Sequence, residues 1–365
     1  MTPASANLKH LQRLCCSGLS GEALVPELLR GLRSVVPSRS NAFMWCDERC
    51  EITNSCSEDP VFWDMMPVYL NEFHDRRNRE VLPAFSDFMR ERPTVTHARR
   101  VVADDRRLYG SAWYAHILRR LAWRNVAYTK IRAGAYPLGM LLQGLDSTKP
   151  EVTAREAALM LKLAPFIAHG LTHTDAGDAH YADSDTHGLL IFGLRGELLF
   201  QTPSASELLF RTTFARGSAR AYRRALEKPL PPFVRKLCND LEAVFAAGEA
   251  LANAPSYTHS NAWGRFLYQA RWLDGPDSTT RAIAVTIELQ LPVEVVLLRR
   301  IASLGLPPKQ ADVCFQIARG ASHAAIAKTL GTSTHAVNWH LRQIYARLDV
   351  HNAAELNRKL LRESS

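Results

Sequence analysis

The chain has 365 residues, 47% of them hydrophobic, and a formal net charge of +9. This length suits three domains of ordinary size, and the hydrophobic content is that of a globular protein rather than a disordered chain. No run of eighteen apolar residues occurs, and the first residues lack the charged-then-apolar order of a signal peptide, so the sequence predicts no membrane span and no export. Seven irregularly spaced cysteines are typical of reduced thiols, and we expect a cytoplasmic protein.

Residues 1–175 have the pattern of one α+β domain. Thr153 followed by Glu156 forms a capping box at the start of a long amphipathic helix that ends at Leu171. The expected helices are 8–14, 23–36, 107–121 and 153–171, the expected strands are 41–46, 51–55, 126–133 and 138–143, and 61–88 is expected to be helical and irregular. Strands followed by a closing helix near residue 170 resemble a GAF-like sensory domain.

Aromatic side chains are dense in this first domain. They can line an apolar cavity for a small organic ligand, or they can pack as an ordinary core. We expect a ligand pocket here. Its candidate lining residues are Trp45, Trp63, Tyr69, Trp113, Tyr114, Trp123 and Tyr128.

Three cysteines, Cys46, Cys50 and Cys56, surround the expected hairpin. Three thiolates within reach of one another can bind zinc or pair oxidatively, but a fourth metal ligand is not evident. The simpler interpretation is three unconnected thiols, so we predict no metal and no cofactor.

Residues 176–187 are polar and small, which predicts a linker, and residues 188–290 then read as a second domain. A hairpin is expected at 188–193 and 197–201, helices at 204–209 and 233–247, and strands at 262–273 and 281–289. Strand, glycine turn, strand and then helix resemble the opening of a PAS domain. Residues 291–304 are predicted to form a connecting helix.

Residues 305–365 have the pattern of a small all-α domain. Helices are expected at 308–319, 324–330, 333–348 and 353–362. Gly331 between the second and third of these marks a helix-turn-helix. In the third helix, apolar residues recur every three or four positions, so one face is buried, and the other face is polar and cationic without an acid.

This segment resembles the LuxR family of DNA-binding domains, also called the FixJ/NarL type. The resemblance rests on Ile317-Ala318-Arg319-Gly320, Ile326-Ala327-Lys328-Thr329-Leu330-Gly331 and Ile344-Tyr345-Ala346-Arg347-Leu348, among other segments from Leu306 to Leu361. The chain departs from the family pattern where Lys309-Gln310 replaces the usual Arg-Glu and Asn338 replaces a lysine.

The resemblance implies that the third helix enters the major groove of DNA. Asn338, Trp339 and Arg342 would then face base edges. The residues placed for phosphate contacts are Lys328, Thr334, His335 and Arg347. A different possibility for Trp339 is that its indole packs inside the domain.

The predicted fold class is therefore a multidomain α+β protein with GAF-like and PAS-like sensory domains before a four-helix LuxR-type domain. We expect a one-component transcriptional regulator that binds double-stranded DNA as a homodimer and responds to a small organic effector, with RNA polymerase as a further candidate partner. In the alternative, the sensory domains only dimerise or bind a protein. The sequence carries no Gly-x-Ser-x-Gly elbow, phosphate-binding Gly-rich loop or His-Glu-x-x-His, so we predict no enzyme activity.

Overall fold

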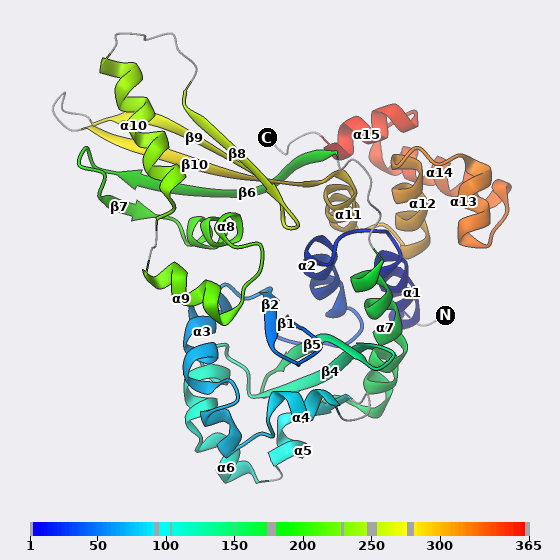
Figure 1. Ribbon diagram of the computed structural model, residues 1–365. Coiled ribbons are helices and arrows are strands. Elements are labelled where there is room, and N and C mark those ends of the chain that lie inside the picture. The colour runs from blue at the N-terminus through cyan, green and yellow to red at the C-terminus, as the bar shows by residue number, and fades with distance from the viewer. Residues whose placement is uncertain are drawn as a thin grey trace.

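The computed structural model describes residues 3–90, 95–102, 104–149, 151–173, 180–227, 230–246, 254–275 and 281–361. Figure 1 shows two antiparallel sheets, each with its own helices, followed by a helical C-terminal part. Among the described residues, no helix has the length and apolar character needed to cross a membrane.

The first sheet has five strands in the order β2-β1-β5-β4-β3. Its strands are β1 (Ser40–Cys46), β2 (Ile52–Ser57), β3 (Val95–His97), β4 (Asn125–Ala133) and β5 (Tyr136–Leu145). Side chains alternate between the two faces of a strand. Phe43 and Leu141 therefore pack toward one helical layer, while Met44 and Met140 pack toward the other.

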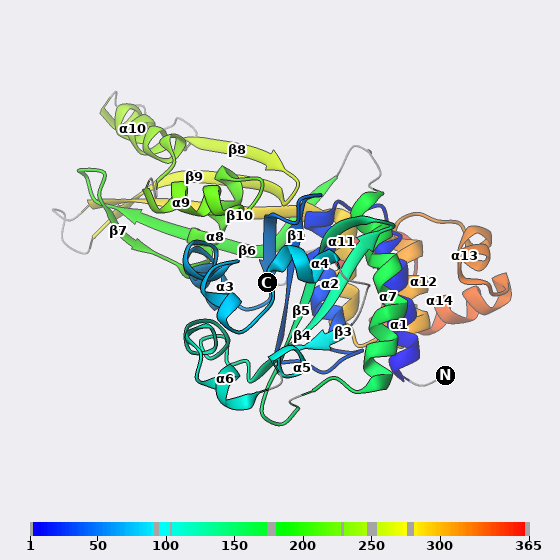
Figure 2. The same cartoon turned by 60° about the horizontal axis from the view of Figure 1, so that its bottom comes forward.

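Helices cover both faces of this sheet. One layer consists of α1 (Pro3–Cys15), α2 (Gly21–Leu32) and α7 (Ala154–Thr172), and α1 and α7 lie side by side in Figures 1 and 2. The other layer consists of α3 (Val61–Val68), the π-turn η1 (Tyr69–Phe73), the 3-10 turn η2 (Arg77–Glu80), α4 (Phe85–Arg90), α5 (Ala98–Val102), α6 (Asp105–Tyr109) and the π-turn η3 (Tyr114–Leu118). The capping box of Thr153 and Glu156 is present at the start of α7, as predicted.

The second sheet also has five antiparallel strands, in the order β7-β6-β10-β9-β8. They are β6 (Tyr181–Phe192), β7 (Leu198–Gln201), β8 (Ser256–Asn261), β9 (Gly264–Asp274) and β10 (Arg281–Pro292), accompanied by α8 (Pro203–Thr213), α9 (Ala219–Glu227) and α10 (Pro232–Ala246). Phe266, Tyr268 and Val285 are buried on the face that α8 and α10 cover.

The structure corrects the sequence prediction at several elements. Residues 181–187, assigned to the linker, form the first half of β6 and pair with β10. Their polar side chains do not prevent this, because strand pairing uses backbone N–H and C=O groups. The alternating polar strand β8 and the short basic helix α9 were not predicted. The helix expected at 107–121 is broken at Gly110 into α6 and η3.

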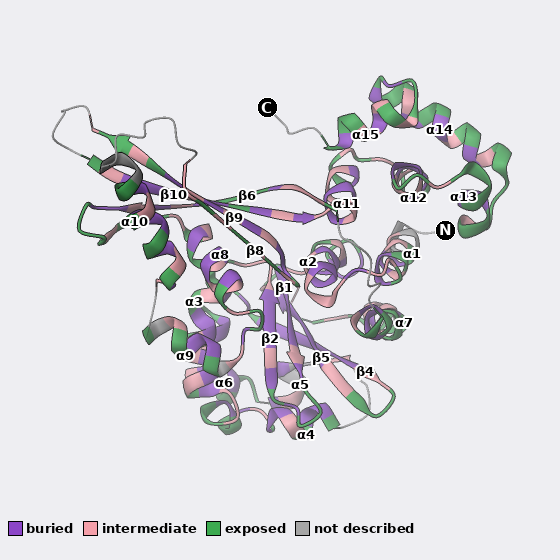
Figure 3. Ribbon diagram, turned by 45° about the horizontal axis from the view of Figure 1, so that its top comes forward, coloured by how far each residue is buried: buried purple, intermediate pink, exposed green. Residues whose placement is uncertain are grey.

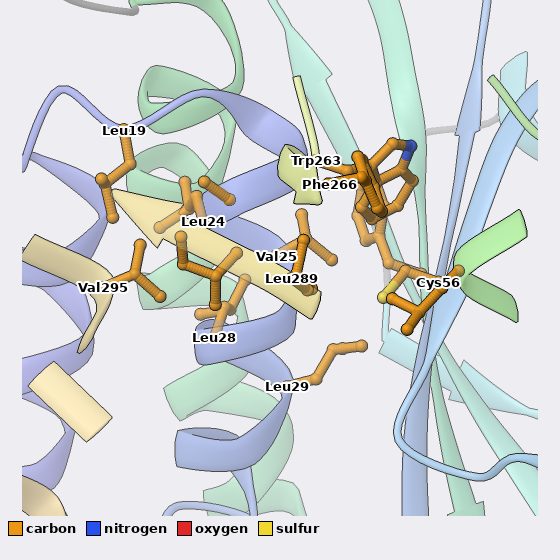
Figure 4. Packing of buried hydrophobic residues seen from close by; sticks show 14 of the residues in the cluster. Leu19, Leu24, Val25, Leu28, Leu29, Cys56, Trp263, Phe266, Leu289 and Val295 are labelled. Atoms are coloured by element: carbon orange, nitrogen blue, oxygen red, sulfur yellow. The ribbon is translucent and has the colours of Figure 1, made fainter. Parts of the chain in front are cut away.

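Helix α2 lies between the two sheets and is buried on most of its surface. Its Leu24, Val25 and Leu28 point toward Leu289 of β10 and Val295 of α11 (Val293–Ser303), as Figure 4 shows. Trp45 of β1 meets Trp263 edge to face across the same junction, with ring centroids 6.1 Å apart. The two sheet domains therefore share one continuous apolar core.

Candidate DNA interface and sensory cavity

The C-terminal part consists of four short helices around a separate core. They are α12 (Pro308–Ala318), α13 (His323–Leu330), α14 (Thr334–Leu348) and α15 (Ala353–Leu361). Gly331 ends α13 with φ of +59°, in the left-handed region that favours glycine. The Ser333 hydroxyl oxygen then accepts a hydrogen bond from the Ala336 N–H at 3.1 Å and caps α14.

Helix α14 buries one face and exposes the other. Val337, Leu341 and Ile344 are buried against the other helices of the domain. The predicted DNA-facing residues Asn338, Trp339 and Arg342 are exposed, as are the predicted phosphate contacts Lys328, Thr334, His335 and Arg347. In Figure 3 the outer sides of α13 and α14 are largely green, the colour of exposed residues.

Trp339 does not pack inside the domain. Its side chain is 52% exposed, and its indole lies edge-on to the His340 ring at 5.0 Å between centroids. Burial, helped by the Lys309 charge, lowers the pKa of His340, so this ring stays neutral beside the cationic face. Arg347 also donates hydrogen bonds to the carbonyls of Leu304 and Gly305, at 3.4 and 3.3 Å, and so ties α14 to the end of α11.

A helix-turn-helix whose second helix presents an acid-free, exposed face has the form of a DNA-binding domain. Residues 305–360 match the family model described as bacterial regulatory proteins, luxR family (GerE). This part of the chain is a LuxR-type helix-turn-helix domain, which implies DNA binding. No curated protein sequence matches the chain.

Two solved structures show a distant likeness to the chain. One is the crystal structure of the E. coli DhaR(N)-DhaL complex, with 13% identity, a TM-score of 0.24, and coverage of 76% of this chain and 86% of that chain. The other is the sensor region of a sensor histidine kinase, with 15% identity, a TM-score of 0.18, and coverage of 45% of this chain and 63% of that chain. Neither likeness is close enough to support an assignment of fold or function.

A cavity lies in the first domain, between the sheet and the layer that includes α3 and α4. Its volume is about 60 Å³. Seven of its nineteen lining residues are aromatic, and none of the nineteen carries a charge. Four of the seven residues proposed from the sequence for a ligand pocket, Tyr69, Trp113, Trp123 and Tyr128, are among the lining residues.

Three of the predicted pocket residues lie elsewhere. Trp45 points to the opposite face of the sheet, because its position in β1 alternates with that of Met44. Trp63 packs against Phe210 of the second domain, with ring centroids 5.7 Å apart, and Tyr114 is half-buried against Tyr109. These aromatic residues therefore belong to domain packing, which the sequence could not distinguish from a cavity wall.

Two buried polar atoms of the cavity wall have no hydrogen-bond partner. They are the Asn78 side-chain oxygen, in η2, and the Tyr128 hydroxyl, in β4. Asn78 is 4% exposed and Tyr128 is 5% exposed. Burial raises the pKa of Tyr128 well above its ordinary value, so its hydroxyl stays protonated and can donate a hydrogen bond.

The three clustered cysteines do not converge. Cys46 and Cys50 belong to the core on the cavity side of the first sheet, whereas Cys56 belongs to the core on the α2 side. Burial raises the pKa of Cys46 and of Cys56 to about 12, so both thiols are protonated at neutral pH. No metal-ligating cluster of three side chains occurs in the part of the chain that the structure describes.

Two polar contacts attach α11 and α12 to the first domain. Arg299 of α11 donates to the buried Glu27 of α2 at 2.9 Å. Asp312 of α12, which is 9% exposed, pairs with Arg13 of α1 and lies 3.5 Å from the Nδ1 of His10. These contacts join α1 to α12 of the DNA-binding domain and α2 to α11, the helix that precedes it.

Proposed function

We propose that the chain is a one-component transcriptional regulator, not an enzyme, that binds DNA through α14 and is controlled by a small organic ligand in the cavity of the first domain. The observation that carries the DNA-binding role is the exposed face of Asn338, Trp339 and Arg342 within a matched LuxR-type domain. Asn can pair with adenine and Arg with guanine in the major groove, and an apolar ring can contact a thymine methyl group.

The support for ligand control is the cavity together with its connection to the DNA-binding domain. The cavity is apolar and carries two unpartnered polar atoms, the usual composition of a small-molecule site. The sheet that forms one cavity wall packs on its other face against α2 and α7, and α1 packs against both of these helices. Helix α1 holds α12 through Asp312, and α2 holds α11 through Arg299.

The second candidate function is a regulator whose sheet domains serve only for dimerisation or protein contacts. Helix α7 favours a role in dimerisation, because its Leu161 and Phe166 are exposed at 45% and 36%. Helix α11 offers no such exposed face, because residues 293–301 are all buried or half-buried within one chain. We therefore place the homodimer contact on α7. Light scattering at tens of micromolar tests this, and a strictly monomeric mass would contradict it.

Two alanine substitutions, one of an arginine and one of a lysine, test the DNA-binding role. Arg342→Ala should weaken binding at the specific site by roughly 1–3 kcal/mol and relax the preference for one base, because Arg342 faces base edges. Lys328→Ala should weaken binding to all sequences about equally and reduce the salt slope by roughly one. The measurement is a set of binding titrations at several salt concentrations, with operator and unrelated duplexes.

The matched control is Arg195→Ala, which removes one exposed positive charge from the β6–β7 turn, far from α14. It should leave both site preference and salt slope unchanged. Unaltered site selectivity in Asn338→Ala, Trp339→Ala and Arg342→Ala together would mean that the recognition surface lies elsewhere.

A further inference from the structure

We propose that the cavity of the first domain takes a neutral molecule with one aromatic ring and a hydroxyl group, the phenol class. This inference rests on the proposed ligand control and specifies the chemistry of the ligand. Four features of the cavity lead to it: its size, its lack of charge, its two unpartnered polar atoms and its aromatic wall.

The size of the cavity sets the number of ligand atoms. The cavity of about 60 Å³ is less than half of the roughly 150 Å³ that admits benzene. It is therefore too small for a long acyl chain, and it admits one six-membered ring only if flexible side chains of its wall move aside. Met44, Met65 and Met140 also line the cavity, and their flexible side chains can adjust to the outline of a ring.

The lining makes a charged ligand unfavourable. A carboxylate buried among uncharged side chains loses its hydration without gaining an ion-pair partner. Lys130 is a buried cation on this side of the sheet, and its Nζ lies 4.1 Å from the centroid of the Phe88 ring. Phe88 lines the cavity but Lys130 does not, so the Lys130 ammonium is not presented to the ligand.

The unpartnered atoms require a hydrogen-bond donor on the ligand. The Asn78 side-chain oxygen only accepts, so it needs an N–H or O–H group. The Tyr128 hydroxyl can donate or accept. A ligand hydroxyl both donates and accepts, so it can satisfy either atom or both, whereas an ether or ketone cannot satisfy Asn78. A buried polar atom without a partner is costly, and its pairing favours the ligand that supplies a donor.

The wall favours a flat ring. Phe88 and Tyr128 meet edge to face at 5.4 Å, and Trp113 and Trp123 also line the cavity. Aromatic pairs gain from offset or edge-to-face contact beyond the burial of their area. Access is provided near Pro83, which is exposed and lines the cavity, a few residues after Asn78.

The test compares three probes of similar size on the full-length chain: phenol, toluene and benzoate. Isothermal titration at pH 7.5 should show phenol binding at least about fivefold more tightly than toluene, since one neutral hydrogen bond gives about that factor. Benzoate should not bind. The proposal is overturned if benzoate or toluene binds as tightly as phenol, or if none of the three probes binds.

Tyr128→Phe and Asn78→Leu locate the hydrogen bonds, because each removes a polar atom and keeps most of the side-chain volume. At least one of them should lower phenol affinity toward the toluene value while leaving toluene affinity unchanged. Tyr136→Phe, at an exposed position of the same domain outside the cavity, is the matched control and should change neither. Phenol affinity unchanged in both cavity variants would also overturn the proposal.

Probe binding and operator binding, measured on the same protein, separate the ligand class from the regulatory role. If phenol binds as expected but leaves operator affinity unchanged, the cavity chemistry stands and ligand control fails. If the chain binds its operator selectively while none of the three probes binds, the DNA-binding role stands and the ligand class is wrong.

Discussion

The two sheets of this protein have the same number of strands and the same antiparallel pairing, but they are covered differently. The first has helices on both faces, and its core on one side contains a cavity. The second buries Phe266 and Tyr268 on one face, while Arg265, Leu267 and Gln269 of the same strand stay half-buried on the other. The cavity lies between one face of the first sheet and a single helical layer, so the difference between the two domains lies in how that layer is built.

The helices on the cavity side are short and irregular, which explains why that core is not filled. Two π-turns and one 3-10 turn interrupt it, and each changes the direction in which side chains project. The part of the shared core that lies under the second sheet, called the second core below, is built from the strands of that sheet and from α8 and α10. It also pairs its buried Tyr268 hydroxyl with Thr212 at 2.7 Å, whereas the Tyr128 hydroxyl in the first domain has no partner.

The largest expected effect is at the centre of the second core. Phe266→Ala should reduce the free energy of unfolding by about 3–5 kcal/mol, because Phe266 is fully buried among well-packed neighbours. Chemical denaturation measures this loss. Phe200→Ala on the edge strand β7, where the ring is 68% exposed, is the control and should change stability by less than about 0.5 kcal/mol.

A smaller loss is expected at the glycine under the cavity wall. A Cβ at Gly144 would lie 2.1 Å from the Trp123 indole nitrogen, which donates to the Ser40 hydroxyl at 2.7 Å. Gly144→Ala should therefore displace Trp123 and cost about 1–3 kcal/mol. In Gly144→Ala combined with Trp123→Phe, the smaller ring should relieve part of the clash. The double variant would then be more stable than the sum of the two single changes predicts, and strict additivity would contradict this contact.

A gain in stability is expected where the cavity is filled. Val126→Leu adds one methylene to a buried side chain of the cavity wall and should increase stability by up to about 0.8 kcal/mol while weakening phenol binding. In the tightly packed second core, Val285→Leu should instead decrease stability. Chemical denaturation measures both changes in the free energy of unfolding. If both substitutions stabilise the protein, or both destabilise it, the two cores do not differ in packing.

The smallest expected effect is on the contact between the first domain and the DNA-binding domain. Burial, with a contribution from the Arg13 charge, lowers the pKa of His10 below its unfolded value of 6.5. The stabilisation is therefore present above pH 6.5 and is lost as the pH falls through the lowered pKa. His10 keeps 37% of its side chain exposed, so the effect should be small.

Hydrogen exchange of the α1 amides between pH 7.5 and 5.5 measures this effect, once the intrinsic pH dependence of exchange is removed. Protection should fall at the lower pH, and His10→Gln should abolish the fall. If the hydrogen-exchange protection of α1 in the unmodified chain does not depend on pH, then His10 stays neutral in this pH range or does not contribute to the contact with α12.

The sequence predicted the DNA-binding domain most completely. Its helices are short, regular and amphipathic, and Ser333, Gly331 and Val337 mark their ends and faces by local chemistry alone. Strand β8 was missed because its residues are almost all polar, and only its pairing with β9 makes it a strand. Asn78 was missed as a cavity residue because a single polar side chain in an irregular turn has no periodic signal. The face of β1 that Trp45 occupies depends on how β1 pairs with β2 and β5, and only the assembled sheet defines that register.

The contact between Arg13 and Asp312 joins residues almost three hundred positions apart in the chain. Such a contact cannot form by local folding, because the two sheet domains that separate α1 from α12 in the chain must first bring these helices together. The DNA-binding domain has its own core and folds from local contacts, but its attachment requires that the domains before it are already folded. The attachment therefore makes the orientation of α14 conditional on the folded state of the whole chain. A destabilising change in either sheet domain should then release an intact DNA-binding domain rather than unfold it.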